Sequence, residues 1–182
     1  MTKYEKLFFD VDDTLIDFKA AEKVALPIVF KEYKMDFTEE VESYYKTLNR
    51  QLWTALEHGE ITREQLLERR FRETMQHFGQ KVDGREMDEQ YRSLLVNTVV
   101  LIDGAEQVLS QLSEKYELYI VTNGMIKTQH DRLKAANLTP YFKRIFVSEE
   151  TNYQKPQIEF FNYVMVNVKD FKKSTSMIIG DS

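Results

Sequence analysis

Short stretches with strand character alternate with helical segments through the second half of the chain. Residues 117–121, 144–147 and 176–179 each consist of one polar residue followed by apolar ones, among them β-branched or aromatic residues. Between them, residues 125–136 and 158–168 place apolar side chains at helical spacing. Strands and helices that alternate in this way predict a doubly wound, Rossmann-like parallel sheet with right-handed crossovers. The predicted fold class is therefore α/β.

A further strand is expected near the amino terminus, where three apolar residues, 7–9, lead directly into Asp10, Asp12 and Asp13. A short apolar run of this kind suits a buried strand of the same sheet. In open α/β sheets ligands bind just beyond the carboxyl ends of the strands. Carboxylates held this close repel one another, and a divalent cation with a preference for oxygen ligands, such as magnesium (Mg2+), stabilises them. The alternative is a solvated acidic turn.

Residues 16–100 show helical periodicity and no convincing strand. We therefore expect an all-helical domain of three or four helices at 16–100, inserted into an α/β core made of residues 1–15 and 101–182. The chain stops three residues after its last predicted strand. Two interpretations are open: the protein is unusually short, or the sequence is a fragment whose core lacks its C-terminal part.

Three positions carry signals for helix ends. Thr62 with Gln65 forms a capping-box pattern at the start of a helix. Asp103 with Glu106 predicts a second capped start. Asn137 is suited to end a helix in the left-handed conformation.

Charge and cysteine content restrict the function. The 182 residues include 25 Lys and Arg against 30 Asp and Glu, a net charge of −5, which argues against a nucleic-acid polymer or an anionic membrane as partner. The absence of cysteine excludes disulfides, thiolate catalysis and cysteine-ligated metals. The amino-terminal apolar run is too short for a signal peptide or a membrane span. We expect a cytoplasmic protein with a small-molecule partner, and the oligomeric state stays open.

Each predicted strand is followed by polar residues of a defined kind. Thr122 and Asn123 follow the second strand, Lys155 follows the third after a loop, and Asp181 follows the fourth. Because parallel strands bring their carboxyl ends to one edge of the sheet, these side chains are expected to meet the aspartates of the first strand. Carboxylates, a hydroxyl beside a helix amino terminus and a lysine together suit a magnesium ion and a phosphoryl group.

Taken in order, the acidic stretch at Asp10 and Asp12, then Thr122, Lys155 and Gly180-Asp181 resemble the four signature motifs of the haloacid dehalogenase (HAD) superfamily. The helical insertion is similar to the cap of its helical-cap, or C1-type, branch. The match runs across the whole chain, but the chain ends within the fourth motif, before a second acidic residue that normally follows.

The resemblance implies a mechanism. Asp10 is the implied nucleophile and forms an aspartyl-phosphate, and Asp12 protonates the leaving group and then deprotonates water. Lys155 neutralises the developing charge. Members that displace halide typically lack an aspartate at the position of Asp12, so a phosphatase is expected rather than a dehalogenase.

The resemblance also implies the ligand contacts. Magnesium is held by Asp10, the backbone carbonyl of Asp12, and Asp181. Thr122 and the backbone N–H of Asn123 bind phosphate oxygens. Lys155 contributes to the same phosphate site.

The substrate is indicated by residues of the helical insertion. Trp53, Arg70 and Phe71 lie in segments that resemble the cap of the bacterial pyrimidine 5′-nucleotidase branch. Their alternative role is packing and surface charge. The leading hypothesis is thus a magnesium-dependent phosphomonoesterase for nucleoside 5′-monophosphates. The alternatives are a phosphatase of a sugar phosphate or another small metabolite, and a non-catalytic or incomplete phosphate- or metal-binding protein.

Overall fold

The computed structural model describes residues 3–181 and divides the chain into two compact units. Met1, Thr2 and Ser182, which fall within the predicted α/β core, lie outside the described residues. One unit comprises Met1–Ala21 with Val99–Ser182 and is called the α/β unit here; the other, Glu22–Thr98, is called the helical unit.

The first boundary falls later than the predicted position after residue 15. The chain beyond that point is still tied to the α/β unit, since the N–H of Asp17 donates to the carbonyl of Val100 (2.8 Å). The N–H of Phe18 likewise donates to Asp13 Oδ1 (3.1 Å). The first turn of helix α1 (Phe18–Glu32) therefore belongs to the α/β unit.

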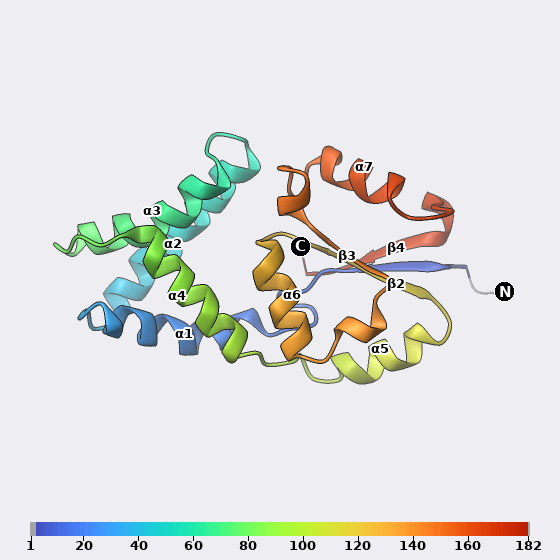
Figure 1. Cartoon of the computed structure of the whole chain (residues 1–182), viewed down its shortest axis with the longest axis horizontal. Coiled ribbons are helices and arrows are strands. Elements are labelled where there is room, and N and C mark those ends of the chain that lie inside the picture. The colour runs from blue at the N-terminus through green and yellow to red at the C-terminus, as the bar shows by residue number, and fades with distance from the viewer. Residues whose placement is uncertain (1–2, 182) are drawn as a thin grey trace. The chain divides into compact units, whose positions relative to one another are not determined.

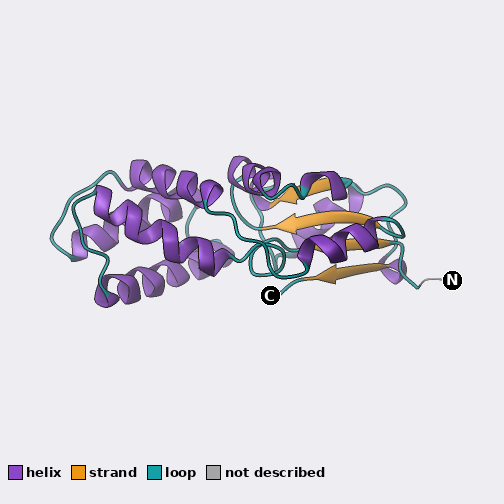
Figure 2. Cartoon of the chain, turned by 90° about the horizontal axis from the view of Figure 1, so that it is seen from below, coloured by secondary structure: helices purple, strands orange, loops and turns teal. Residues whose placement is uncertain are grey.

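Four parallel strands form one sheet in the order β3-β2-β1-β4, which confirms the predicted doubly wound α/β fold. Figure 2 shows the strands side by side. In this register Leu7 of β1 lies opposite Leu118 of β2 and Met177 of β4. The strands are β1 (Lys6–Phe9), β2 (Glu117–Thr122), β3 (Arg144–Val147) and β4 (Ser176–Ile179).

Helices cover both faces of the sheet. Successive side chains of β1 point to opposite faces, so apolar residues on each face need a covering layer. Leu7 and Phe9 belong to the same buried cluster as Leu109 of α5 and Leu133 of α6. Phe8 points to the opposite face, where it packs in the cluster that contains side chains of α7. Figure 1 shows α5 and α6 on one side of the sheet and α7 on the other. Their bounds are α5 (Ala105–Ser113), α6 (Ile126–Ala135) and α7 (Ile158–Val166), and short 3₁₀ turns lie at Thr139–Tyr141, Ser148–Glu150 and Lys173–Thr175.

The predicted helix ends have different outcomes. The capping box of Thr62 and Gln65 is confirmed by both of its hydrogen bonds. Asn137 follows α6 with a φ of 57°, as predicted. The predicted cap at Asp103 is wrong: α5 begins after Gly104, whose φ of 79° sets the turn without a side-chain hydrogen bond.

The helical unit is built around an aromatic core. Its helices bury Phe30, Tyr45, Phe71 and Tyr91 completely, with neighbouring ring centroids 5.2–6.0 Å apart. Such tilted and edge-to-face pairs stabilise a core beyond the area they bury. Within residues 3–181, every helix is too short or too polar to cross a lipid bilayer. The helices of this unit are α1 from Glu22 onward, α2 (Glu39–Glu57), α3 (Arg63–His77) and α4 (Gly84–Asn97).

Candidate active site

Asp10 is the first residue after β1 and stands at the carboxyl edge of the sheet. Its N–H donates to the carbonyl of Ile179 at the end of β4 (2.9 Å), which extends the parallel ladder by one residue. Its Oδ1 accepts from the N–H of Val11 (2.8 Å), and its Oδ2 is ion-paired with Lys155 Nζ. Burial raises the pKa of Asp10, and the ammonium of Lys155 opposes that shift. The result is a buried carboxylate facing a cation that is only slightly exposed.

Lys155 reaches Asp10 from the loop after β3, and the side chain of Asn123 holds that loop in place. Asn123 Nδ2 donates to the carbonyl of Lys155 (3.0 Å), and Asn123 Oδ1 accepts from the N–H of Lys155 (2.8 Å). The motif resemblance implied a role for the backbone N–H of Asn123 alone. The side-chain role depends on the approach of two loops and leaves no local sequence signal.

Thr122 ends β2 and is buried, with 1% of its surface exposed. Its hydroxyl donates to the carbonyl of Asn123 (3.2 Å) and accepts from Gln129 Nε2 (2.8 Å). Just beyond it, Glu149 Oε2 accepts from the N–H of Ile126 at the start of α6 (2.6 Å). One donor of this helix amino terminus is therefore already used by the protein.

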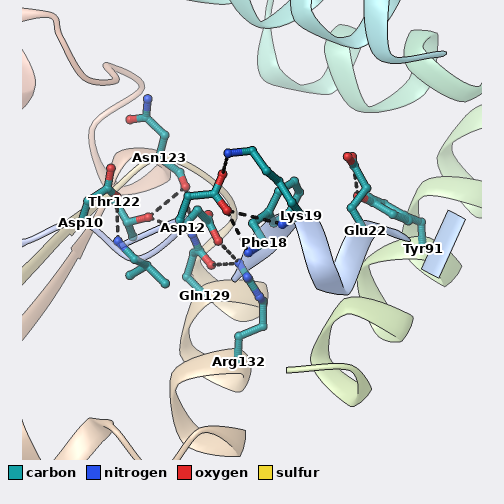
Figure 3. Close-up of polar contacts among 12 residues, drawn as sticks. Asp10, Asp12, Phe18, Lys19, Glu22, Tyr91, Thr122, Asn123, Gln129 and Arg132 are labelled. Atoms are coloured by element: carbon teal, nitrogen blue, oxygen red, sulfur yellow. Dashed lines mark hydrogen bonds and ion pairs between the residues drawn. The ribbon is translucent and has the colours of Figure 1, made fainter. Parts of the chain in front are cut away.

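Asp12 is held by two residues of α6 that the sequence analysis did not identify. Arg132 Nη1 donates to Asp12 Oδ1 (2.6 Å), and Gln129 Nε2 donates to Asp12 Oδ2 (3.1 Å). Figure 3 shows both side chains rising from the helix toward Asp12. One feature of the sequence could have indicated them. Both polar residues lie on the face of α6 that also carries Leu133, and a face that packs against the core is expected to be apolar.

The remaining acidic residues of the turn cap helix α1. Asp13 adopts a φ of 53° and accepts from the N–H of Phe18, and its Oδ2 is paired with Lys19 Nζ (2.9 Å). Asp17 Oδ1 accepts from the N–H of Ala20 (2.8 Å). These contacts satisfy N–H groups that a helix start leaves without partners.

Oxygen donors at this edge of the sheet suit magnesium. Asp181 lies two residues beyond Ile179, whose carbonyl bonds the N–H of Asp10. Its charge also contributes to raising the pKa of Lys19, after the larger effect of Asp13. Among residues 3–181, no three acidic or histidine side chains form a metal-binding group. The predicted set needs only two carboxylates, because Asp12 contributes its backbone carbonyl, and carboxylate and carbonyl oxygens are ligands that magnesium accepts.

The three substrate residues expected in the helical unit occupy different environments. Phe71 is fully buried in the aromatic core. Arg70 is 5% exposed, ion-paired with Asp88, and stacked over the Tyr91 ring at 5.0 Å. Trp53 is partly exposed beside an apolar cluster. These placements favour packing for Phe71, and substrate contact by the three residues stays a prediction.

The fold and these side chains define a Rossmann-like α/β protein with an aspartate-rich site at the carboxyl edge of its sheet. A family model described as haloacid dehalogenase-like hydrolase matches residues 7–182. The chain therefore belongs to the haloacid dehalogenase-like hydrolase family, as the motif resemblance predicted.

Three relatives illustrate the similarity. The HAD-hydrolase YfnB of Bacillus subtilis is 43% identical over 182 residues, covering 100% of this chain and 77% of the relative. A crystal structure of YfnB, described as bound to magnesium, has a TM-score of 0.96 and covers 100% of this chain and 81% of that chain. The pyrimidine 5′-nucleotidase PynA of Streptococcus pneumoniae is 37% identical, covering 98% of this chain and 76% of the relative. The pyrimidine 5′-nucleotidase YjjG of Escherichia coli is 28% identical, covering 99% and 78%.

Proposed function

We propose that this protein is a magnesium-dependent phosphomonoesterase that forms an aspartyl-phosphate on Asp10. The observation that carries the proposal is the buried carboxylate of Asp10, ion-paired with Lys155 and followed two residues later by a second carboxylate, Asp12. A buried nucleophile, a cation beside it and a nearby acid–base group are the parts that phosphoryl transfer to a carboxylate requires.

The reaction has two steps. In the first, an oxygen of Asp10 attacks phosphorus, the bond from phosphorus to the ester oxygen breaks, and Asp12 gives its proton to the departing alkoxide. In the second, Asp12 takes a proton from water as that water attacks phosphorus, and the carboxylate of Asp10 leaves. The nucleophile and the acid–base group thereby return to their starting forms.

Phosphate recognition falls to the residues after β2 and β3. The N–H of Asn123 and the ammonium of Lys155 are the donors for its oxygens, and the hydroxyl of Thr122 joins them once its hydrogen turns from the carbonyl of Asn123. Magnesium, held by Asp10, the carbonyl of Asp12 and Asp181, supplies positive charge that offsets repulsion between nucleophile and phosphate.

Nucleoside 5′-monophosphates, pyrimidine ones in particular, are the proposed substrates. Support comes from PynA and YjjG, both named pyrimidine 5′-nucleotidases, which align with nearly the whole chain. The net charge of −5 further favours a small phosphomonoester over a nucleic-acid polymer or a membrane as partner. A cytoplasmic location is proposed because a sequence without cysteine fits a reducing compartment.

The test is hydrolysis of a panel of pyrimidine and purine nucleoside monophosphates and sugar phosphates, with magnesium and with a chelator in its place. We expect magnesium-dependent phosphate release that is fastest with pyrimidine nucleotides. Asp10→Asn, which has the same size, should abolish turnover while leaving the protein folded. Preference for sugar phosphates would replace the proposed substrate class. Activity retained by Asp10→Asn, or none in the unaltered protein, would refute the phosphomonoesterase mechanism.

A further inference from the structure

Two buried polar residues of α6 bind the carboxylate of Asp12 from the same side. Gln129 and Arg132 lie three residues apart, so both point from one face of the helix. They are 3% and 2% exposed, whereas the side chain of Asp12 is 33% exposed. Water can reach this carboxylate, so its own solvation does not require a buried arginine. Burial costs free energy mainly for the arginine, because it loses its contact with water. This indicates that the contact is there to hold the carboxylate of Asp12.

The arginine is incompletely satisfied where it lies. Nη1 donates to Asp12 Oδ1 and to Gln129 Oε1 (2.9 Å), while Nε and Nη2 are buried without a hydrogen-bond partner among residues 3–181. Its guanidinium stacks over the Phe18 ring, 5.5 Å from the centroid. Among the described residues, the hydrogen bonds of the guanidinium are therefore concentrated on Nη1, the group that holds Asp12.

Gln129 holds the second oxygen of Asp12 more loosely. Its Nε2 has two hydrogens for three acceptors: Thr122 Oγ1 at 2.8 Å, the carbonyl of Asn123 at 3.0 Å, and Asp12 Oδ2 at 3.1 Å. The contact with Asp12 is the longest of the three. Oδ1 is therefore the fixed oxygen, bonded to Arg132 at 2.6 Å, and Oδ2 is the releasable one.

We propose that Gln129 and Arg132 are positioning residues that orient the carboxylate of Asp12 for proton transfer. Arg132 fixes Oδ1, so that Oδ2 exchanges the proton, giving it to the ester oxygen as the phosphorus–oxygen bond breaks and regaining it from water afterwards. The inference rests on the proposed phosphomonoesterase function and names two residues on which its acid–base step depends.

The leaving group provides a test that a structural role would not satisfy. A nucleoside 5′-monophosphate expels an alkoxide that needs a proton, whereas p-nitrophenyl phosphate expels a stable phenolate that does not. The comparison uses kcat/KM, which reports only the steps up to departure of the leaving group. Hydrolysis of the aspartyl-phosphate also uses Asp12, but it comes later and therefore does not affect kcat/KM.

Arg132→Ala should lower kcat/KM for the nucleotide by about 10–100-fold, a typical loss when a supporting partner of a site residue is removed, and leave p-nitrophenyl phosphate nearly unchanged. Gln129→Ala should show the same split with a smaller loss. Arg132→Lys should restore part of the nucleotide activity, because it keeps the charge without the planar geometry of the guanidinium. Lys134→Ala, which removes an exposed basic residue of the same helix, is the matched control and should leave kcat/KM unchanged for both substrates.

A double substitution separates positioning from folding. If Arg132 acts through Asp12, adding Arg132→Ala to Asp12→Asn should cause no further loss on the nucleotide. Equal losses on the two substrates, no loss at all, or additive losses in the double variant would overturn the positioning role while leaving the phosphatase intact. An unaltered protein inactive on both substrates would instead refute the proposed function, and this inference with it.

Discussion

The carboxamide of Asn123 forms hydrogen bonds with both the N–H and the carbonyl of Lys155, a residue 32 positions further along the chain. A single side chain thereby sets the path of the loop that carries the lysine. The ammonium of Lys155 pairs with Asp10. The side chain of Asn123 therefore helps to place the cation that lies beside the proposed nucleophile.

Asn123→Ala should lower kcat by about 10–100-fold, because the loop that presents the lysine loses its support. Loss of the two hydrogen bonds should also cost about 1–3 kcal/mol of unfolding free energy. Steady-state kinetics and urea unfolding measure the two effects. Asn97→Ala, at an exposed position of α4, is the control and should change neither quantity. Full activity in Asn123→Ala would show that Lys155 is placed without this contact.

Gly124 should not tolerate a side chain. Its φ is 137°, and an added Cβ would lie 3.3 Å from both Cγ and Nε2 of Gln129. Gly124→Ala should cost about 1–3 kcal/mol through backbone strain and, by pushing Gln129, should also reduce nucleotide turnover. Gly79 has a φ of 80° and open space around it, so Gly79→Ala should cost stability alone. Unchanged turnover in Gly124→Ala would contradict the role given to Gln129.

Arg70 should be a major source of stability for the helical unit. It is buried and paired with the completely buried Asp88, which also bonds Arg92 at 2.7 Å. Arg70→Ala should lower the unfolding free energy by about 3 kcal/mol, the scale for breaking a buried pair. Lys46→Ala breaks only an exposed pair with Glu42 and should cost less than about 1 kcal/mol. A stable Arg70→Ala variant with a raised KM would instead support the predicted contact with substrate.

Lys6 and Glu117 lie opposite each other on β1 and β2 and should make stability depend on pH. The hydrogen bond from Lys6 holds the pKa of Glu117 below its usual 4.5. Stability from this pair is therefore complete above that value and is lost as pH falls through the lowered pKa of the folded state. Glu117→Gln should cost about 1 kcal/mol or less at neutral pH, since Glu117 is half exposed, and the difference should shrink in acid. Thermal unfolding across pH measures it, and a difference that grew toward low pH would contradict the account.

The sheet was predictable because each strand contains a contiguous apolar run. The expected limits of β3 and β4 match the structure, and β2 extends one residue further because Thr122 still pairs with Val147. The failed expectation of a cap at Asp103 shows the limit of local patterns. A glycine in the left-handed conformation can set a helix start as well as a capping side chain can.

The site was predictable for residues at or shortly after the carboxyl end of a strand, and for Lys155 in the loop after β3. Asp10, Asp12 and Thr122 could be placed because strand order sets their position. Gln129 and Arg132 act from within a helix, where a polar residue is ordinarily taken as solvated. Their function depends on the three-dimensional approach of α6 to the acidic turn, across sequence separations of 117 and 120 residues.

Identification of the phosphorylated residue is the sharpest test of whether Asp10 is the nucleophile. The protein is mixed with substrate and magnesium, quenched within a turnover, treated with borohydride and mapped by mass spectrometry. An aspartyl-phosphate at Asp10 is reduced to homoserine, so the account predicts homoserine at position 10 only when substrate was present. Homoserine at another aspartate, or none while phosphate is being released, would contradict the assignment of Asp10 as the nucleophile.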